Sequence, residues 1–150
     1  MHIRHRSADK GFTLLEVMIS VGILALVAGS AMMFMGNFLS QSNLRSEHTL
    51  VLSLVKQART LSLANRNRKA HGVKILSSTY VLFEGWSYAG RDASLDLSYN
   101  RDTSVMITGP SEIIFYTLSG RSGTTALTFG HASTTTTYAI NINTEGSIDW

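Results

Sequence analysis

The chain has 150 residues, which allows one domain with a modest core, and no linker-like segment divides it. Its formal net charge is +3, but the first eleven residues hold Arg4, Arg6 and Lys10 against Asp9 alone, so the rest of the chain carries about +1. This balance removes the electrostatic argument that the rest of the chain binds nucleic acid. Without cysteine there is no disulfide or thiolate metal site, and the five histidines lack metal-ligand spacing, so we expect no metal and no cofactor.

An apolar segment begins at Phe12 and continues to Leu39 with Glu16 as its only charged residue. A bilayer core requires about 20 such residues as helix, so the pattern predicts a membrane-spanning helix over residues 12–40. The basic residues before it would hold its N-terminal side in the cytoplasm. A cleavable secretory signal is the alternative, but the small residues 28–31 that could form its cleavage site lie inside the apolar run.

Glu16 has two interpretations. A carboxylate at the centre of a spanning helix costs about 2.5 to 3.5 kcal/mol, so such a residue usually has a partner or a function. Alternatively, the four residues from Thr13 to Glu16 fit a capping box, with Thr13 as N-cap and Glu16 at the third helical position.

The stretch Lys10-Gly11-Phe12-Thr13-Leu14-Leu15-Glu16-Val17 resembles the processing motif of type IV prepilins and pseudopilins. The resemblance implies that residues 1–11 are a leader, that prepilin peptidase cuts after Gly11, and that the new amino terminus of Phe12 is methylated. It also implies that Glu16 pairs with the amino terminus of a neighbouring subunit during assembly. Gly11 and Phe12 are then substrate residues, and we expect no catalytic residue in this chain.

Gly22, Gly29 and Gly36 recur every seven residues and fall near one face of the predicted helix. They could permit close helix packing in a filament core, or they could reflect the general frequency of glycine in membrane helices.

After Gln41 the helical spacing continues with an apolar stripe, which predicts an amphipathic continuation over residues 41–65. The stripe consists of Leu44, Val51, Leu54, Val55, Ala58 and Leu61. From residue 70 onward, short β-branched and aromatic runs alternate with turn residues. These predict strands at 72–76, 80–85, 95–99, 105–108, 113–118, 126–129, 138–142 and 147–150. The predicted fold class is therefore α+β, with a long N-terminal helix whose second half packs against an antiparallel β-sheet head at residues 70–150.

Arg66, Arg68 and Lys69 form the only positive cluster outside the leader. Cations after a helix complement its dipole, and this interpretation is favoured. The alternative is a phosphate-contacting patch of a DNA-binding minor pilin, but no aromatic residue lies nearby in the sequence for base stacking.

The head resembles the H-type pseudopilin (GspH) and FimT-like minor pilin family. The matching stretches are 58–64, Ile114-Phe115 with Gly120-Arg121, 138–142 and 146–148. The C-terminal residues 143–150 contain no lysine or arginine, which departs from a DNA-binding FimT-like protein. The resemblance implies a non-enzymatic minor subunit of a type II secretion pseudopilus or type IV pilus, anchored in the bacterial inner membrane with a periplasmic head. Its implied partners are prepilin peptidase, other pilins or pseudopilins and secreted cargo. No hydrolase elbow or phosphate-binding loop argues for an enzyme, and His131 fits a loop histidine.

Overall fold

The computed structural model describes residues 11–150, without the side chains of residues 31–37. Its first element is α1 (Leu14–Leu63), an uninterrupted helix of 50 residues that contains no proline. The chain divides into two compact units, Met1–Gly36 and Asn37–Trp150. The first unit contains the start of α1, and the second contains the rest of α1 and every strand.

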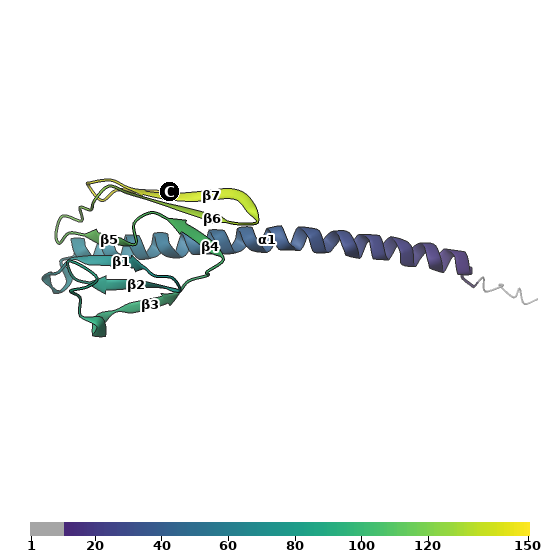
Figure 1. The fold of residues 1–150 in the computed structure, drawn as a ribbon, viewed down its shortest axis with the longest axis horizontal. Helices are drawn as coiled ribbons and strands as arrows, with labels where there is room; N and C mark the ends of the chain where they lie inside the picture. The colour runs from purple at the N-terminus through teal and green to yellow at the C-terminus, as the bar shows by residue number, and fades with distance from the viewer. Residues whose placement is uncertain (1–10) are drawn as a thin grey trace, which may run out of the picture. The chain divides into compact units, whose positions relative to one another are not determined.

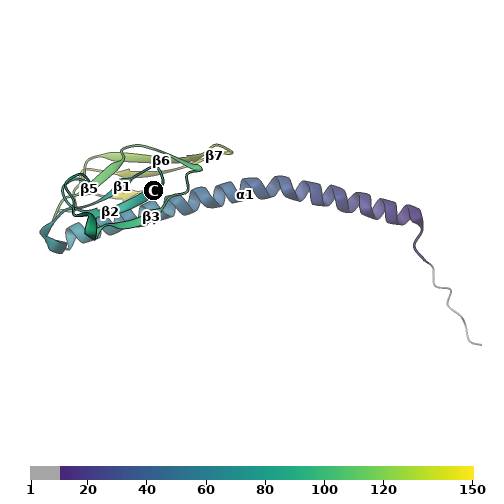
Figure 2. The ribbon, with the colours of Figure 1, turned by 60° about the horizontal axis from the view of Figure 1, so that its bottom comes forward.

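The second unit consists of the C-terminal part of α1 and two antiparallel sheets, and we call this whole unit the head. After α1 come the 3-10 helix η1 (Arg66–Arg68), β1 (His71–Ile75), β2 (Thr79–Glu84), the 3-10 helix η2 (Ala93–Leu95), β3 (Leu97–Asn100), β4 (Val105–Thr108), β5 (Glu112–Phe115), β6 (Thr125–His131), β7 (Thr134–Ile142) and β8 (Ile148–Asp149). The first sheet has the strand order β3-β2-β1-β5 and the second has the order β4-β6-β7-β8. Figures 1 and 2 show both sheets beside the C-terminal part of α1. The predicted α+β class is confirmed.

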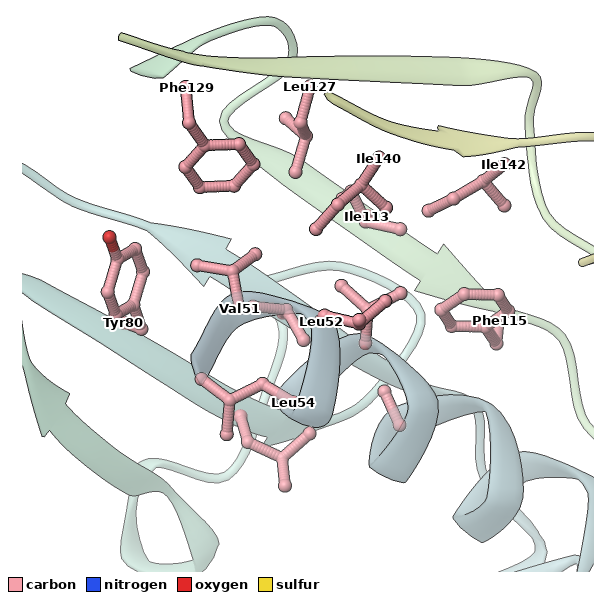
Figure 3. Close-up of a cluster of buried hydrophobic side chains, with 14 of the residues drawn as sticks. Val51, Leu52, Leu54, Tyr80, Ile113, Phe115, Leu127, Phe129, Ile140 and Ile142 are labelled. Carbon is pink, nitrogen blue, oxygen red and sulfur yellow. The ribbon is translucent and has the colours of Figure 1, made fainter. Parts of the chain in front are cut away.

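The core of the head lies between α1 and the two sheets. Most of the predicted helix stripe is buried: Leu44, Val51, Leu54, Val55 and Ala58 are all at most 1% exposed, whereas Leu61 is partly buried against the core. Side chains from both sheets meet these residues, and Figure 3 shows aromatic and aliphatic groups of β5, β6 and β7 facing the helix. The helical period of 3.6 places this stripe on one side of α1, so one face of the helix closes the core of both sheets.

Gly72 in β1 marks a close approach between strands. A Cβ at this position would lie 2.6 Å from the Ile113 carbonyl oxygen and 2.6 Å from Cζ of Phe83. Phe83 is the partner of Gly72 in the β1–β2 register, and the Phe83 ring occupies the space that a side chain would need. Glycine therefore lets the Phe83 ring pack across β1.

A polar cluster is buried where α1 meets β2. The carboxylate of Glu47, which is 8% exposed, accepts hydrogen bonds from the Tyr80 hydroxyl and, at 3.1 Å, from the Asp102 backbone N–H. On the next helix position, the His48 ring stacks on Tyr138 with centroids 5.2 Å apart. Buried polar groups require such partners, so these contacts fix α1 against both sheets.

Several element boundaries differ from the predicted ones for local reasons. α1 ends at Leu63 rather than at residue 65, because Asn65 has a left-handed backbone with φ of 52°. β3 begins at Leu97, since the residues before it form η2, capped by the Asp92 side chain. β5 ends at Phe115, and the predicted continuation to Leu118 is a turn.

Candidate processing and assembly site

The bond between Gly11 and Phe12 lies outside helical structure. Gly11, Phe12 and Thr13 precede α1, which begins at Leu14. The Phe12 side chain is 83% exposed, and a Cβ built on Gly11 would have nothing within 4 Å. Exposed backbone outside regular structure is where proteases act most readily, so this bond suits a peptidase substrate. The basic leader residues Arg4, Arg6 and Lys10 lie outside the described residues.

Thr13 caps the first turn of α1, but only half of the predicted capping box is present. The Thr13 Oγ1 accepts a hydrogen bond of 3.2 Å from the Glu16 backbone N–H, and the Thr13 carbonyl accepts one of 3.2 Å from Val17. Among the described residues, nothing hydrogen-bonds or ion-pairs with the Glu16 carboxylate. Capping by Thr13 therefore leaves the Glu16 carboxylate available for a partner outside the described chain. The negative charge of Glu16 in the first turn also complements the dipole of α1.

The apolar side chains that follow Glu16 find no packing within their own unit. Every large apolar residue described between Phe12 and Val27 is more than half exposed, with values from 51% at Val17 to 83% at Phe12. A helix that is apolar on all sides needs partners that cover it, either other helices or lipid. Among residues 11–30 and 38–150, for which side chains are described, no helix is both long enough and apolar enough to cross a membrane.

Gly22 and Gly29 have no structural reason within the described chain. A Cβ built at either position would have nothing within 4 Å. The side-chain space at Gly36, the third glycine of the predicted seven-residue repeat, is outside the described residues. A packing role for these glycines therefore requires contacts with other molecules.

The positive cluster lies beyond the helix rather than in its last turn. α1 has no basic residue in its last turn, and Arg66 and Arg68 belong to η1 in a turn with left-handed backbone. Lys69 forms an ion pair of 3.4 Å with Glu84. Because the dipole effect fades within one turn, the favoured explanation for this cluster is weakened.

The fold brings together two aromatic rings that lie far apart in the sequence. Trp86 follows Gly85, whose N–H bonds the Ala70 carbonyl at 2.8 Å, and the Trp86 ring lies 5.9 Å from the Tyr116 ring. No local signal could have found this proximity, because it arises from pairing of β1 with β2 and β5.

His131 ends β6 and does not lie in a free loop as expected. Its Nδ1 lies 2.8 Å from the Ser133 Oγ and accepts a hydrogen bond of 3.2 Å from the Ser133 N–H. Within the described part of the chain, no three His, Cys, Asp or Glu residues are grouped so as to hold a metal ion.

Comparison with known proteins identifies the N-terminal segment. No solved structure matches the chain. Residues 6–32 match the family model described as the prokaryotic N-terminal methylation motif, which is the signal of type IV pilins and pseudopilins. This signal implies processing by prepilin peptidase and assembly with other pilins, and it indicates a structural subunit rather than an enzyme. The chain therefore carries a type IV pilin or pseudopilin signal, which together with its helix and antiparallel sheets supports the pilin-like class.

Proposed function

We propose that this protein is a minor pseudopilin or minor pilin, cut after Gly11, methylated on Phe12 and assembled through α1 into a type II secretion pseudopilus or type IV pilus. The observation that carries the proposal is the arrangement at the start of α1. A non-helical, exposed Gly11–Phe12 bond is followed by a helix with exposed apolar side chains and one acid that lacks a described partner.

Before assembly, the apolar start of α1 is held in the bacterial inner membrane. The sequence from Phe12 to Leu39 contains one charged residue, and the leader supplies three cations that favour the cytoplasm. The head then lies on the periplasmic side. The exposed apolar side chains must be covered by lipid before assembly and by neighbouring helices afterwards.

Cleavage gives Glu16 a partner that the precursor lacks. It creates an ammonium group on Phe12, and the same group on an incoming subunit can approach the Glu16 carboxylate of a neighbour. Opposite charges attract strongly in a low-dielectric surrounding, and an unpaired carboxylate is costly there. Pairing would therefore favour one axial register between subunits over the alternatives.

The proposed pairing is tested by changing the charge of Glu16 without changing its size. Glu16→Gln should be cleaved like the wild type, yet the amount recovered in filaments should fall at least tenfold. Glu16→Asp keeps the charge and should retain more assembly than Glu16→Gln. Immunoblots of membrane and filament fractions measure both steps. Normal assembly of Glu16→Gln would show that the carboxylate does not set the register.

A further inference from the structure

A hollow in the head lies between the last turns of α1 and the C-terminal segment. It has a volume of about 360 Å³ and is lined by Lys56, Arg59, Thr60, Ser147 and Ile148. We call it the Lys56–Arg59 hollow. Figure 2 shows the C-terminus of the chain beside this part of α1. Two of the lining residues are cations and none is an acid, so the hollow is positively charged.

Arg59 is half-buried and makes no hydrogen bond or ion pair with any other described residue. The other described arginines that are half-buried are both bonded. Arg91 pairs with Asp96 at 2.8 Å, and Arg101 donates to two backbone carbonyl groups. A charge that is partly removed from water is costly without a partner, so Arg59 requires one from outside the described chain.

The turn before β8 covers the Nε atom of Arg59 and fixes the guanidinium group. Gly146 has φ of 76°, and a Cβ built there would lie 3.1 Å from Nε and would overlap the Gly120 carbonyl oxygen. Nε is buried and has no hydrogen-bond partner, so the turn holds it by packing alone. The terminal Nη atoms are the ones that can still reach a ligand. A guanidinium group held in this way loses little further freedom when it binds.

Lys56 adds a second cation on the same face of α1. It lies three positions before Arg59, and side chains at this spacing are neighbours on a helix. Its Nζ atom lies 3.3 Å from the centre of the Trp150 ring, and no carboxylate of the described chain pairs with it. Two like charges at this spacing repel each other, and an anion bound between them would remove the repulsion.

We infer that the Lys56–Arg59 hollow binds the carboxylate of an Asp or Glu side chain of another protein. The planar fork of Arg59 matches the two oxygen atoms of a carboxylate, and the Lys56 ammonium supplies a second positive charge. Trp150 is 67% exposed beside Lys56 and offers apolar contact surface. Tryptophan and arginine are enriched where proteins bind one another. The inference goes beyond the proposed function because it concerns the head and requires no cleavage.

The acids around the hollow disfavour a nucleic acid as its occupant. Glu145 and Asp149 lie on either side of residues 146–148 in the sequence. A nucleic acid carries a phosphate at every nucleotide and would bring further negative charge towards these two acids. A single carboxylate brings one charge, which suits a site that contains two cations.

Nuclear magnetic resonance of the full-length protein in detergent tests the site with glutarate as the probe. Because the Arg59 Nε is buried, its proton exchanges slowly with water and reports on a ligand at the Nη atoms. We expect a saturable shift of this resonance with glutarate and none with chloride at the same ionic strength. A glutarate titration without a saturable shift would overturn the inference.

Two variants show whether the cations of the hollow bind the probe. The amide resonances of Thr60 and Ser147, which line the hollow, follow the titration in both. Arg59→Met keeps a long side chain beneath the turn and should abolish glutarate binding. Lys56→Met, on its own, should weaken binding at least threefold. Unchanged glutarate affinity in both variants would place the bound probe elsewhere and contradict the inference.

Photo-crosslinking in the protein's own cells identifies the source of the carboxylate. A photo-reactive benzoylphenylalanine replaces Trp150, and a matched control carries it at Met106, which is 57% exposed on β4. We expect the Trp150 position to capture one protein segment that contains Asp or Glu, with a yield at least fivefold above the Met106 position. Arg59→Glu should lower this yield at least fivefold, whereas Arg45→Glu, at an exposed position of the same helix, should retain it.

A charge exchange completes the test. Replacing the captured acid of the partner by lysine should restore the yield that Arg59→Glu lowers. Crosslinks to nucleic acid or lipid, equal yields from the Trp150 and Met106 positions, or no recovery after the charge exchange would overturn the inference. The N-terminal mass of the same samples reports cleavage separately, so failure of the inference is distinguishable from failure of the proposed function.

Discussion

Glu47 and Tyr80 form a buried polar contact between α1 and β2. Both residues are buried, and the carboxylate also accepts the Asp102 N–H. Burial raises the pKa of the Tyr80 hydroxyl above its usual range, and the hydrogen bond to Glu47 raises the pKa further. The neutral hydroxyl is therefore the form that the folded head requires.

Tyr80→Phe should destabilise the head by about 1 to 3 kcal/mol, because Glu47 loses a hydrogen-bond donor while it stays buried. The pH dependence gives a second signature. A raised pKa in the folded state contributes stability that is present below pH of about 10, the unfolded tyrosine value, and is lost as the pH rises above it.

Thermal unfolding of the full chain in detergent, followed by circular dichroism from pH 8 to pH 11, measures both effects. The wild type should lose more stability than Tyr80→Phe across this range. Equal losses in the two proteins would show that Tyr80 does not carry the alkaline sensitivity.

His71 makes the stability of the head depend on pH in the acid range. Burial lowers the pKa of its imidazole, Arg66 lowers it further, and Glu84 opposes both. With a folded pKa below the unfolded value of about 6.5, the neutral ring contributes stability above that pH, and this contribution is lost as the pH falls below it.

The melting temperature of the wild type should therefore fall between pH 7.5 and pH 5.5. His71→Gln keeps a neutral donor near Glu84 and should flatten this dependence, whatever its own absolute stability. A slope that survives in His71→Gln would assign the acid sensitivity to other groups.

At the scale of elements, Ser62 joins the end of α1 to the first sheet. It is fully buried, its Oγ donates to the Phe115 carbonyl, and it accepts the His71 N–H at 2.9 Å. One hydroxyl thus links the helix to β5 and β1.

Ser62→Ala should lower the free energy of unfolding by about 1 to 3 kcal/mol, since it leaves a buried N–H and a buried carbonyl short of a partner. Ser53→Ala is the control, because Ser53 lies on the exposed side of the same helix and bonds only the Leu50 carbonyl. Urea unfolding of both variants should show a loss for Ser62→Ala and no loss for Ser53→Ala. Equal effects would remove Ser62 from its linking role.

Periodicity predicted the elements well where one face of an element is buried. The α1 stripe from Leu44 to Ala58 is buried as its spacing indicated, and β4 has the predicted bounds. Boundaries set by backbone conformation were missed at Asn65 and Leu118. Asparagine adopts a positive φ more readily than most residues, so Asn65 carried a signal for the helix end, whereas leucine carries none. The four threonines before Tyr138 belong to β7, although only Tyr138 to Ile142 was predicted as strand.

At the scale of the whole molecule, local sequence signals were informative and long-range pairings were not. The candidate processing residues Gly11 and Phe12 and the candidate assembly residue Glu16 lie within six consecutive positions, so a local motif could indicate all three. The division of the strands into two sheets depends on β5 returning to β1 while β4 pairs with β6. The contact between the Trp86 and Tyr116 rings depends on the pairing of β1 with β2 and β5, which explains why it was not predicted.

The central claim is that the leader is removed after Gly11, and the N-terminal mass of the protein isolated from membranes tests it most directly. Wild-type protein from cells that contain prepilin peptidase should begin at Phe12 and carry one methyl group on its amino terminus. Gly11→Ala, compared with Gly22→Ala as a control glycine inside α1, should keep the leader. Wild-type protein that retains residues 1–11 in such cells would contradict the account.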